Sequence, residues 1–356
     1  MNRWKVISTL RQKGRMSKRD IVRTCNLSLP TVDKIMKIYL KKRVVQEAGF
    51  DRSSGGRRPV LYEFNRRAKY AIGVDFEIPE LTIIIADLKG KAVDRYFSYL
   101  PDKKSASSVI SYVGEKIDEL LLRRKLTAKD IVGVGFGAPA FLNQSRITIS
   151  GKNLPSWKDV PVKEILEERL GIPVFVDNDV NFMSLSESYY MNYRDKVLVY
   201  LALRKGTKGD IRMGAGVLVN GEVFHGAHGN AATLRHAYID FSSRRKYEEV
   251  IEDVMKIQNP RSMVLKLRDH LLTPMLNMIV LFDPARVVIN AGILGKWEDI
   301  FIKKCEEGLK KRLYRLFNWD FRVEIARDRE TPCAKGAAIY VLQKVFGDPY
   351  LFLKNF

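Results

Sequence analysis

Apolar positions recur with helical spacing between residues 17 and 41. Ser17 followed by Asp20 is the signature of a capping box, which predicts that a helix begins here. After a short turn, Ser28 is suited to cap a second helix, and Pro30 is tolerated in its first turn. The apolar residues of this second helix fall at i, i+3, i+4, i+7 and i+8. They predict one buried stripe, made of Val32, Ile35, Met36, Tyr39 and Leu40.

The pattern then changes to alternation. The segments VVQEAGF (44–50) and PVLYEF (59–64) read as two short strands, because Val60, Tyr62 and Phe64 alternate with other residues. The intervening DRSSGGRR is rich in glycine and arginine and predicts an exposed turn. Two helices followed by such a hairpin predict an N-terminal winged helix-turn-helix over residues 1–69.

From Tyr70 onward, strands and helices follow in an α/β order. The predicted elements are strands 70–77, 81–90, 92–99, 131–139 and 173–179 and helices near 105–125, 161–170 and 180–190. A second series repeats the theme, with strands 196–203, 214–220 and 286–290, a hairpin turn at Asn220–Gly221, helices between about 245 and 282, and a closing helical run. We therefore predict one module, 70–356, with lobes of approximately 70–178 and 179–356 and a ligand cleft between them.

Charge gives the first segment a function. The chain has a formal net charge of +21, and residues 1–69 hold 19 Lys and Arg against 5 Asp and Glu. This asymmetry favours a nucleic-acid-binding end, although a solvated basic surface or an anionic membrane would also suit it. The outer face of the second helix is basic, which is typical of a recognition helix in the major groove; a generic helical hairpin is the alternative. The candidate DNA-binding residues are Ser28, Pro30, Thr31, Lys34, Lys37, Arg57 and Arg58.

Composition narrows the remaining classes. No run of about 18 apolar residues and no signal-peptide pattern occurs, so we expect a cytoplasmic protein without a membrane partner. Cys25, Cys305 and Cys333 are far apart and odd in number, which indicates neither a disulfide framework nor a cysteine zinc site.

Several motifs together resemble one family. Five segments resemble parts of the ROK family of sugar kinases and repressors and occur in the family's order. They are IPVFVDNDVNFMSLSE, GFGAPAFLN, NLPSWKDVPV, MGAGVLVNGEVFHGAHG and GGRRP. The resemblance implies a two-lobed actin-like, hexokinase-like (ribonuclease-H-like) module that binds a carbohydrate, and a homodimer or tetramer. The implied ligand-binding residues are Gly137, Asn153, Asn178, Asp179 and His236.

The same resemblance bears on catalysis. In the family's kinases an aspartate at the position of Asp179 takes the proton of a sugar hydroxyl, so Asp179 is the catalytic residue if the chain is a kinase. Where those kinases carry Asp-x-Gly-Gly-Thr, this chain has DFEIP (75–79): Glu77 has the wrong sign for a phosphate, and Pro79 lacks an N–H. The second phosphate loop is preceded by the long and charged KGTKGDIR. We therefore expect no nucleotide cofactor.

Other chemistry is disfavoured as well. The family's sugar-binding Glu is missing from NAATLRHAYID, and no cysteine cluster follows, so His225, His228 and His236 lack the thiolate partners of a zinc site and read as loop residues. The glycines of GVGFGA have dinucleotide-motif spacing but no helix after them. We predict no metal.

The sequence thus predicts a transcription regulator that represses sugar-use genes. Its expected partners are a double-stranded DNA operator and a mono- or disaccharide effector. Two alternatives stay open: an ATP-dependent sugar kinase with an attached DNA-binding domain, and a ligand-independent regulator whose module only dimerises.

Overall fold

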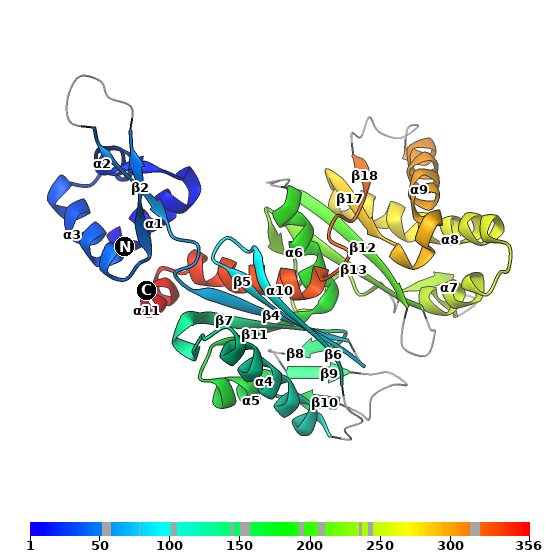
Figure 1. The fold of residues 1–356 in the computed structure, drawn as a ribbon. Helices are drawn as coiled ribbons and strands as arrows, with labels where there is room; N and C mark the ends of the chain where they lie inside the picture. The colour runs from blue at the N-terminus through cyan, green and yellow to red at the C-terminus, as the bar shows by residue number, and fades with distance from the viewer. Residues whose placement is uncertain are drawn as a thin grey trace.

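The computed structural model describes residues 1–51, 58–77, 79–100, 105–143, 146–149, 157–191, 196–205, 211–234, 237–240, 245–313 and 321–356. Within these ranges, a small unit of helices and short strands at the N-terminal end of the chain lies beside two α/β halves (Figure 1). The last two helices of the chain return to the small unit, so the two chain ends lie close together. We find no helix in the described residues that is long and apolar enough to cross a membrane.

The small unit is built on one apolar cluster. Its elements are α1 (Asn2–Lys13), β1 (Met16–Ser17), α2 (Lys18–Cys25), α3 (Leu29–Lys41), β2 (Val45–Phe50) and β3 (Val60–Phe64). The three strands form an antiparallel sheet in the order β1-β3-β2. Helix α1 was not predicted. Its residues Val6, Ile7 and Leu10 are fully buried under α2 and α3.

The local signals for α2 and α3 are confirmed. The Ser17 hydroxyl accepts a hydrogen bond from the Asp20 backbone N–H at 3.2 Å, and the Asp20 carboxylate accepts one from the Ser17 backbone N–H at 3.1 Å. Ser28 caps α3 by accepting from the Thr31 N–H at 3.4 Å. The predicted stripe faces inward: Val32, Ile35, Met36 and Tyr39 are buried and Leu40 is half-buried.

The first α/β half has a mixed sheet in the order β11-β7-β4-β5-β6. Strands β4 (Tyr70–Glu77), β5 (Glu80–Asp87) and β6 (Ala92–Tyr99) are antiparallel neighbours, whereas β7 (Ile131–Ala138) and β11 (Val174–Asn178) run parallel to β4. Helices α4 (Ala106–Arg123) and α5 (Val162–Leu170) cover one face. A smaller sheet contains β8 (Phe141–Asn143), β9 (Arg146–Ile149) and β10 (Trp157–Val160).

The second half repeats this strand order. Strands β12 (Val197–Lys205), β13 (Ile211–Val219) and β14 (Glu222–Val223) are antiparallel neighbours, and β17 (Arg286–Asn290) and β18 (Arg322–Ile325) run parallel to β12. Helices α7 (Tyr247–Met255), α8 (Pro260–Phe282) and α9 (Glu298–Leu313) pack on this sheet. Further short elements are β15 (Tyr238–Asp240), β16 (Arg245–Lys246) and the 3-10 turns Ala128–Asp130 and Gly292–Trp297. The predicted pair of similar α/β halves is present.

Two helices lie between the sheets and hold the halves together. Helix α6 (Asp179–Met191) follows β11, and helix α10 (Pro332–Gly347) packs against α6, β4 and β7; α11 (Pro349–Asn355) follows it. The contact is close because of glycine. A Cβ at Gly336 of α10 would overlap the backbone oxygen of Phe182 in α6, and one at Gly73 of β4 would overlap the backbone of Ala334. Backbone therefore meets backbone at this junction.

We predict that Gly336→Ala destabilises the protein by at least about 2–3 kcal/mol, because overpacking against a backbone atom cannot be relieved by a rotamer change. Gly347→Ala, at the other end of the same helix, meets no heavy atom within 4 Å and supplies the matched control. It should be neutral or stabilising by up to about 1 kcal/mol. Chemical denaturation of both variants measures the difference, and equal stabilities would contradict the close contact.

Candidate functional site

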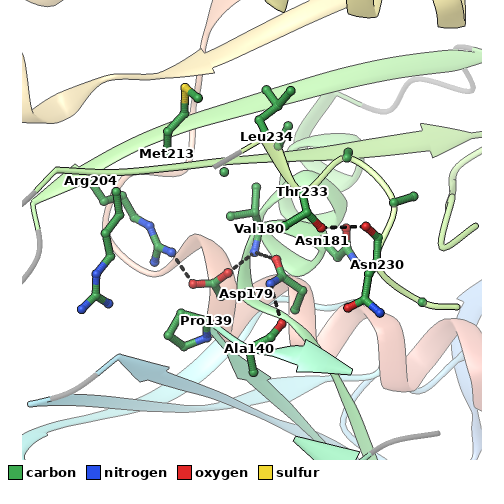
Figure 2. Close-up of a pocket in the computed structure, with 17 residues that line it drawn as sticks. Pro139, Ala140, Asp179, Val180, Asn181, Arg204, Met213, Asn230, Thr233 and Leu234 are labelled. Atoms are coloured by element: carbon green, nitrogen blue, oxygen red, sulfur yellow. Dashed lines mark hydrogen bonds and ion pairs between the residues drawn. The ribbon is translucent and has the colours of Figure 1, made fainter. Parts of the chain in front are cut away.

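A pocket opens between the two halves, at the end of β11 and the beginning of α6 (Figure 2). Its empty space, which includes open solvent, is about 610 Å³. The lining combines polar, charged and small residues from both halves: Pro139, Ala140, Asn178, Asp179, Val180, Asn181, Arg204, Arg212, Met213, Gly214, Ala215, Gly229, Asn230, Ala231, Ala232, Thr233 and Leu234.

Asn178 and Asp179 stand at the junction of β11 and α6. Both side chains accept a hydrogen bond from the Val180 backbone N–H, at 3.0 Å from Asn178 Oδ1 and at 2.7 Å from Asp179 Oδ1. Asn178 Nδ2 donates to the Ala140 carbonyl at 3.2 Å. The first N–H groups of a helix lack partners within the helix, and here these two side chains supply one. The strand-to-helix turn thus fixes both predicted residues at the pocket.

Asp179 is neutralised by an arginine. One guanidinium nitrogen of Arg204, on β12, forms a short ion pair with the Asp179 carboxylate, and the other lies 2.7 Å from Glu77 Oε2. Arg212 on β13 approaches the other Glu77 oxygen at 3.4 Å. All four side chains are at least four-fifths buried. The ion pairs therefore connect β4 of the first half with β12 and β13 of the second.

The guanidinium of Arg204 keeps its charge. Burial lowers the pKa of Arg204, but the carboxylates of Asp179 and Glu77 outweigh the burial and hold the pKa above its ordinary value. Glu77, which the sequence marked as the wrong sign for a phosphate, thus serves as a counter-ion for arginine.

Asp75 lies beneath this cluster and is an unusually weak acid. Burial, reinforced by the negative charge of Glu77, raises its pKa to about 7, while Arg204 acts in the opposite direction. Its Oδ1 is buried without a hydrogen-bond partner. The thiol of Cys333, from the first turn of α10, acts on the pKa of Asp75 in the same direction as Arg204. With a pKa of about 7, Asp75 carries less negative charge near neutral pH than an ordinary carboxylate.

Some polar groups at the pocket were not predicted. Asn230 ties the segment 229–234 to the first half, because its side chain accepts from the Leu142 N–H and donates to the Leu142 carbonyl, both at 3.0 Å. Thr233 Oγ1 donates to the Asn230 carbonyl at 2.6 Å. One signal for these residues was present in the sequence: the segment NAAT (230–233) lies where the family resemblance places a sugar-binding glutamate, which this chain lacks.

A histidine–aspartate pair was also missed. His225 Nε2 lies 2.6 Å from Asp177 Oδ2, and Asn181 Nδ2 donates to Asp177 Oδ1 at 2.8 Å. The hydrogen bond to Asp177 raises the pKa of His225, and partial burial opposes this rise. His225 lies in a loop after β14, as expected, but its side chain is only one-third exposed and pairs with Asp177. His228 is exposed.

The other residues predicted to bind a ligand do not line the pocket or lie outside the described residues. Gly137 lies in β7 below the pocket, where a Cβ would overlap the Cys333 sulfur, and it is not part of the pocket lining. Asn153 and His236 lie outside the described residues, as does Arg57. Among the described residues, no group of three His, Cys, Asp or Glu side chains is arranged to hold a metal ion.

The outer face of α3 is the second candidate site. Pro30, Lys34 and Lys37 are exposed, and Thr31 is half-buried beside the Ser28 hydroxyl at 2.9 Å. Arg58 is exposed and lies two residues before β3. Asp33, the acidic residue of this helix, forms an ion pair with Lys18 at 2.6 Å. The face therefore presents uncompensated positive charge together with short polar groups.

Comparison with known proteins identifies the module. The sequence profile of the ROK family matches residues 71–248, which is half of the chain. The chain belongs to the ROK family. The family assignment made from the motifs is confirmed, and the matched residues include nearly all of β4, all of α6, β12 and β13, and the pocket lining.

Individual ROK proteins resemble the chain over different extents. A protein named xylose repressor, from Caldicellulosiruptor bescii, is 22% identical over 98% of this chain and 97% of its own length. The structure of a ROK family transcriptional regulator, described as a homologue of the E. coli MLC protein, matches with a TM-score of 0.79 at 19% identity over 99% of this chain and 98% of that one. A ROK hexokinase from Thermus thermophilus matches 78% of this chain and 100% of its own, with a TM-score of 0.63 at 19% identity. The predicted α/β ROK sugar-kinase fold is confirmed by these likenesses.

We predict that Asp75 makes stability depend on pH. Its folded pKa of about 7 lies above the value of about 3.9 in an unfolded chain. The folded state therefore holds a proton that the unfolded state has lost, so stability falls as the pH rises from about 4 to about 7. Asp75→Asn should match the wild type near pH 4 and exceed it by about 2–4 kcal/mol at pH 8. Urea unfolding across this range measures the effect.

The control is Asp118→Asn, which removes an exposed carboxylate on α4 that pairs with Arg169. It should change stability by a constant and small amount across the same pH range. If Asp75→Asn and the wild type keep a constant difference from pH 4 to pH 8, the assignment of the raised pKa to Asp75 is wrong.

Proposed function

We propose that the chain is a DNA-binding repressor of sugar-use genes that responds to a carbohydrate bound in the ROK cleft. The observation that carries this proposal is the Arg204 ion pair, because it neutralises Asp179 and fills the phosphate side of the cleft with protein charge. The relative named xylose repressor, which matches nearly the full length of the chain, supports the same function.

We propose that residues 1–69 are a winged helix-turn-helix domain and that 70–356 are the effector module, with lobes of approximately 70–178 and 179–356. In the first domain, α2 and α3 are the two helices of the motif, and β2 and β3 form the wing. The helix α3 would enter the major groove, with Thr31 and Lys34 near base edges. Ser28, Pro30, Lys37 and Arg58, together with Arg57 outside the described residues, complete the proposed contacts.

The cleft suits a neutral polyol better than a nucleotide. Its charged side chains are paired with one another, whereas Asn178, Asn181 and Thr233 offer uncharged hydrogen-bonding groups at the pocket. A kinase needs an aspartate that is free to take a proton and a cradle for phosphates. Here Asp179 is held in an ion pair with Arg204, and Glu77 is paired with Arg204 and Arg212. We therefore propose a sensor of a mono- or disaccharide, with Gly137, Asn153, Asn178, Asp179 and His236 as its predicted ligand-binding residues.

A homodimer or tetramer would fit this function. Two heads related by a twofold axis would read a palindromic operator with half-sites about 34 Å apart, or a multiple of that distance. A sugar would release the operator if it bound more tightly to an arrangement in which the two heads no longer match the half-sites.

We predict that Lys34→Ala weakens binding to the operator selectively, by about 5- to 100-fold, because it removes a contact to base edges. Lys37→Ala should weaken binding to operator and random DNA alike and reduce the salt slope by about 1, since it removes a phosphate contact. The operator is obtained by selecting genomic fragments on the full chain, and fluorescence anisotropy then measures affinity at several salt concentrations. Lys304→Ala, on α9 of the second half, is the control. Equal DNA affinity of a chain that begins at Tyr70 would refute the proposal.

We predict that at least one neutral sugar in a panel that includes D-xylose raises the thermal midpoint, in proportion to the logarithm of its concentration. Asp179→Asn should abolish this shift, and Asp118→Asn should retain it. ATP should cause no turnover of any sugar in the panel. Turnover that is lost in Asp179→Asn would instead establish a kinase, and the absence of any shift with every sugar would favour a ligand-independent regulator.

A further inference from the structure

Helix α10 begins at the cleft and is in contact with its floor. The Cys333 sulfur, in its first turn, occupies the space beside Gly137 of β7, and the backbone at Gly336 touches the backbone at Phe182 of α6. Helix α6 itself begins with Asp179. Because no side chain separates the two helices at Gly336, a displacement of the first turns of α6 cannot be absorbed there without moving α10.

The same helix ends inside the core of the N-terminal head. Over its 16 residues, α10 is about 24 Å long. Its last turn carries Phe346 into an apolar cluster that joins residues 1–69 to β4, β5 and α10. The Phe346 ring packs edge-on against Phe64 at 5.8 Å, and the Arg11 guanidinium lies 4.1 Å from its centroid. The Trp4 indole N–H donates to the Phe346 carbonyl at 2.8 Å. Both α1 and the wing strand β3 are thereby attached to α10.

Helix α11 adds a second set of contacts, to α1 and α3. Phe352 is fully buried and lies edge-on to Tyr39 of α3, with centroids 6.4 Å apart. Phe356 stacks on Phe352 at 4.7 Å. The Phe356 carbonyl accepts hydrogen bonds from Arg3 Nη2 at 3.1 Å and from Lys42 Nζ at 2.5 Å. Lys42 follows directly after α3, so the proposed recognition helix is held by its C-terminal end.

Another connection between head and module is smaller and more polar. The chain passes from β3 to β4 through residues 65–69, where the Leu88 N–H donates to the Arg66 carbonyl at 2.8 Å. The Arg66 side chain lies 3.5 Å from Asp87 and is nearly half exposed. Only the arginine of this pair is exposed, since the Asp87 carboxylate is buried. The contact through α10 and α11 differs from this connection in being mostly apolar and aromatic.

We propose that α10 and α11 transmit the state of the cleft to the DNA-binding head, with Phe352 and Phe356 as the residues that position α3. The proposal rests on the proposed function for its biological meaning, since it describes how an occupied cleft would move the head. In physical terms, the cleft and the head share one rigid element, so a change in the position of α6 changes the seat of α1 and α3.

The test is a double-mutant cycle read by hydrogen exchange in the full chain, without sugar and without DNA. Asp179→Asn disturbs the cleft, and the pair Phe352→Ala with Phe356→Ala removes the seat. Tyr350→Ala is the matched control, because Tyr350 lies on the same helix and is 78% exposed. Exchange is followed in peptides that cover α1 and α3. If coupling is of ordinary strength, Asp179→Asn speeds exchange there by about fivefold or more.

We expect Asp179→Asn to retain this effect in the Tyr350→Ala background and to lose it in the Phe352→Ala, Phe356→Ala background. If the double alanine variant does not fold, Arg3→Ala with Lys42→Ala takes its place, because it removes only the hydrogen bonds to the Phe356 carbonyl. The proposal is overturned if Asp179→Asn leaves head exchange unchanged, or if its effect is the same with and without the seat. Since neither ligand is used, failure to find an operator or a sugar does not alter the outcome of this cycle.

Discussion

The close approach of α6 and α10 is the contact on which the module depends. It requires glycine at position 336, because the Phe182 carbonyl occupies the space where any Cβ would lie. Gly73 and Gly135 allow α10 the same proximity to β4 and β7. These three positions place one helix against the first sheet and against the helix that carries Asp179. The cleft, the sheet beneath it and the support of the head are consequently parts of one packed unit.

The charged side chains at the cleft are paired with one another within the protein. Arg204 lies between the carboxylates of Glu77 and Asp179, and Asp75 beneath them holds a proton up to about pH 7. Buried charges require partners, and the arrangement supplies them within the protein. Uncharged groups such as Asn178 and Thr233 are then left to face a ligand. The charges of Arg204, Glu77 and Asp179 thus offset one another without a bound ligand.

Patterns of short range predicted a large part of this structure. The capping residues of α2 and α3, the stripe on α3, the succession of the main strands and helices along both halves and the position of Asn178 and Asp179 at a strand end all follow from neighbouring residues. Helix α1 was not predicted, because it has no side-chain cap and its apolar face is short. The partners of Glu77 and Asp177 could not be predicted, because Arg204 and His225 are 127 and 48 residues away. Likewise, no spacing in the sequence indicates that Phe346 and Phe356 enter the core of the N-terminal unit.

The matching strand order of the two halves gives the ion pairs a further meaning. Glu77 ends β4, where it is paired with Glu80 across the following turn, and Arg204 is near the end of the equivalent strand β12, where it is paired with Arg212. An acidic turn in one half thus corresponds to a basic turn in the other. Two identical halves would bring like charges together at this point and repel. Glu77 attracts Arg204 and Arg212 across the two halves because the halves differ in the sign of their charge at equivalent positions. Reversing the charge of Glu77 would replace this attraction with repulsion between like charges.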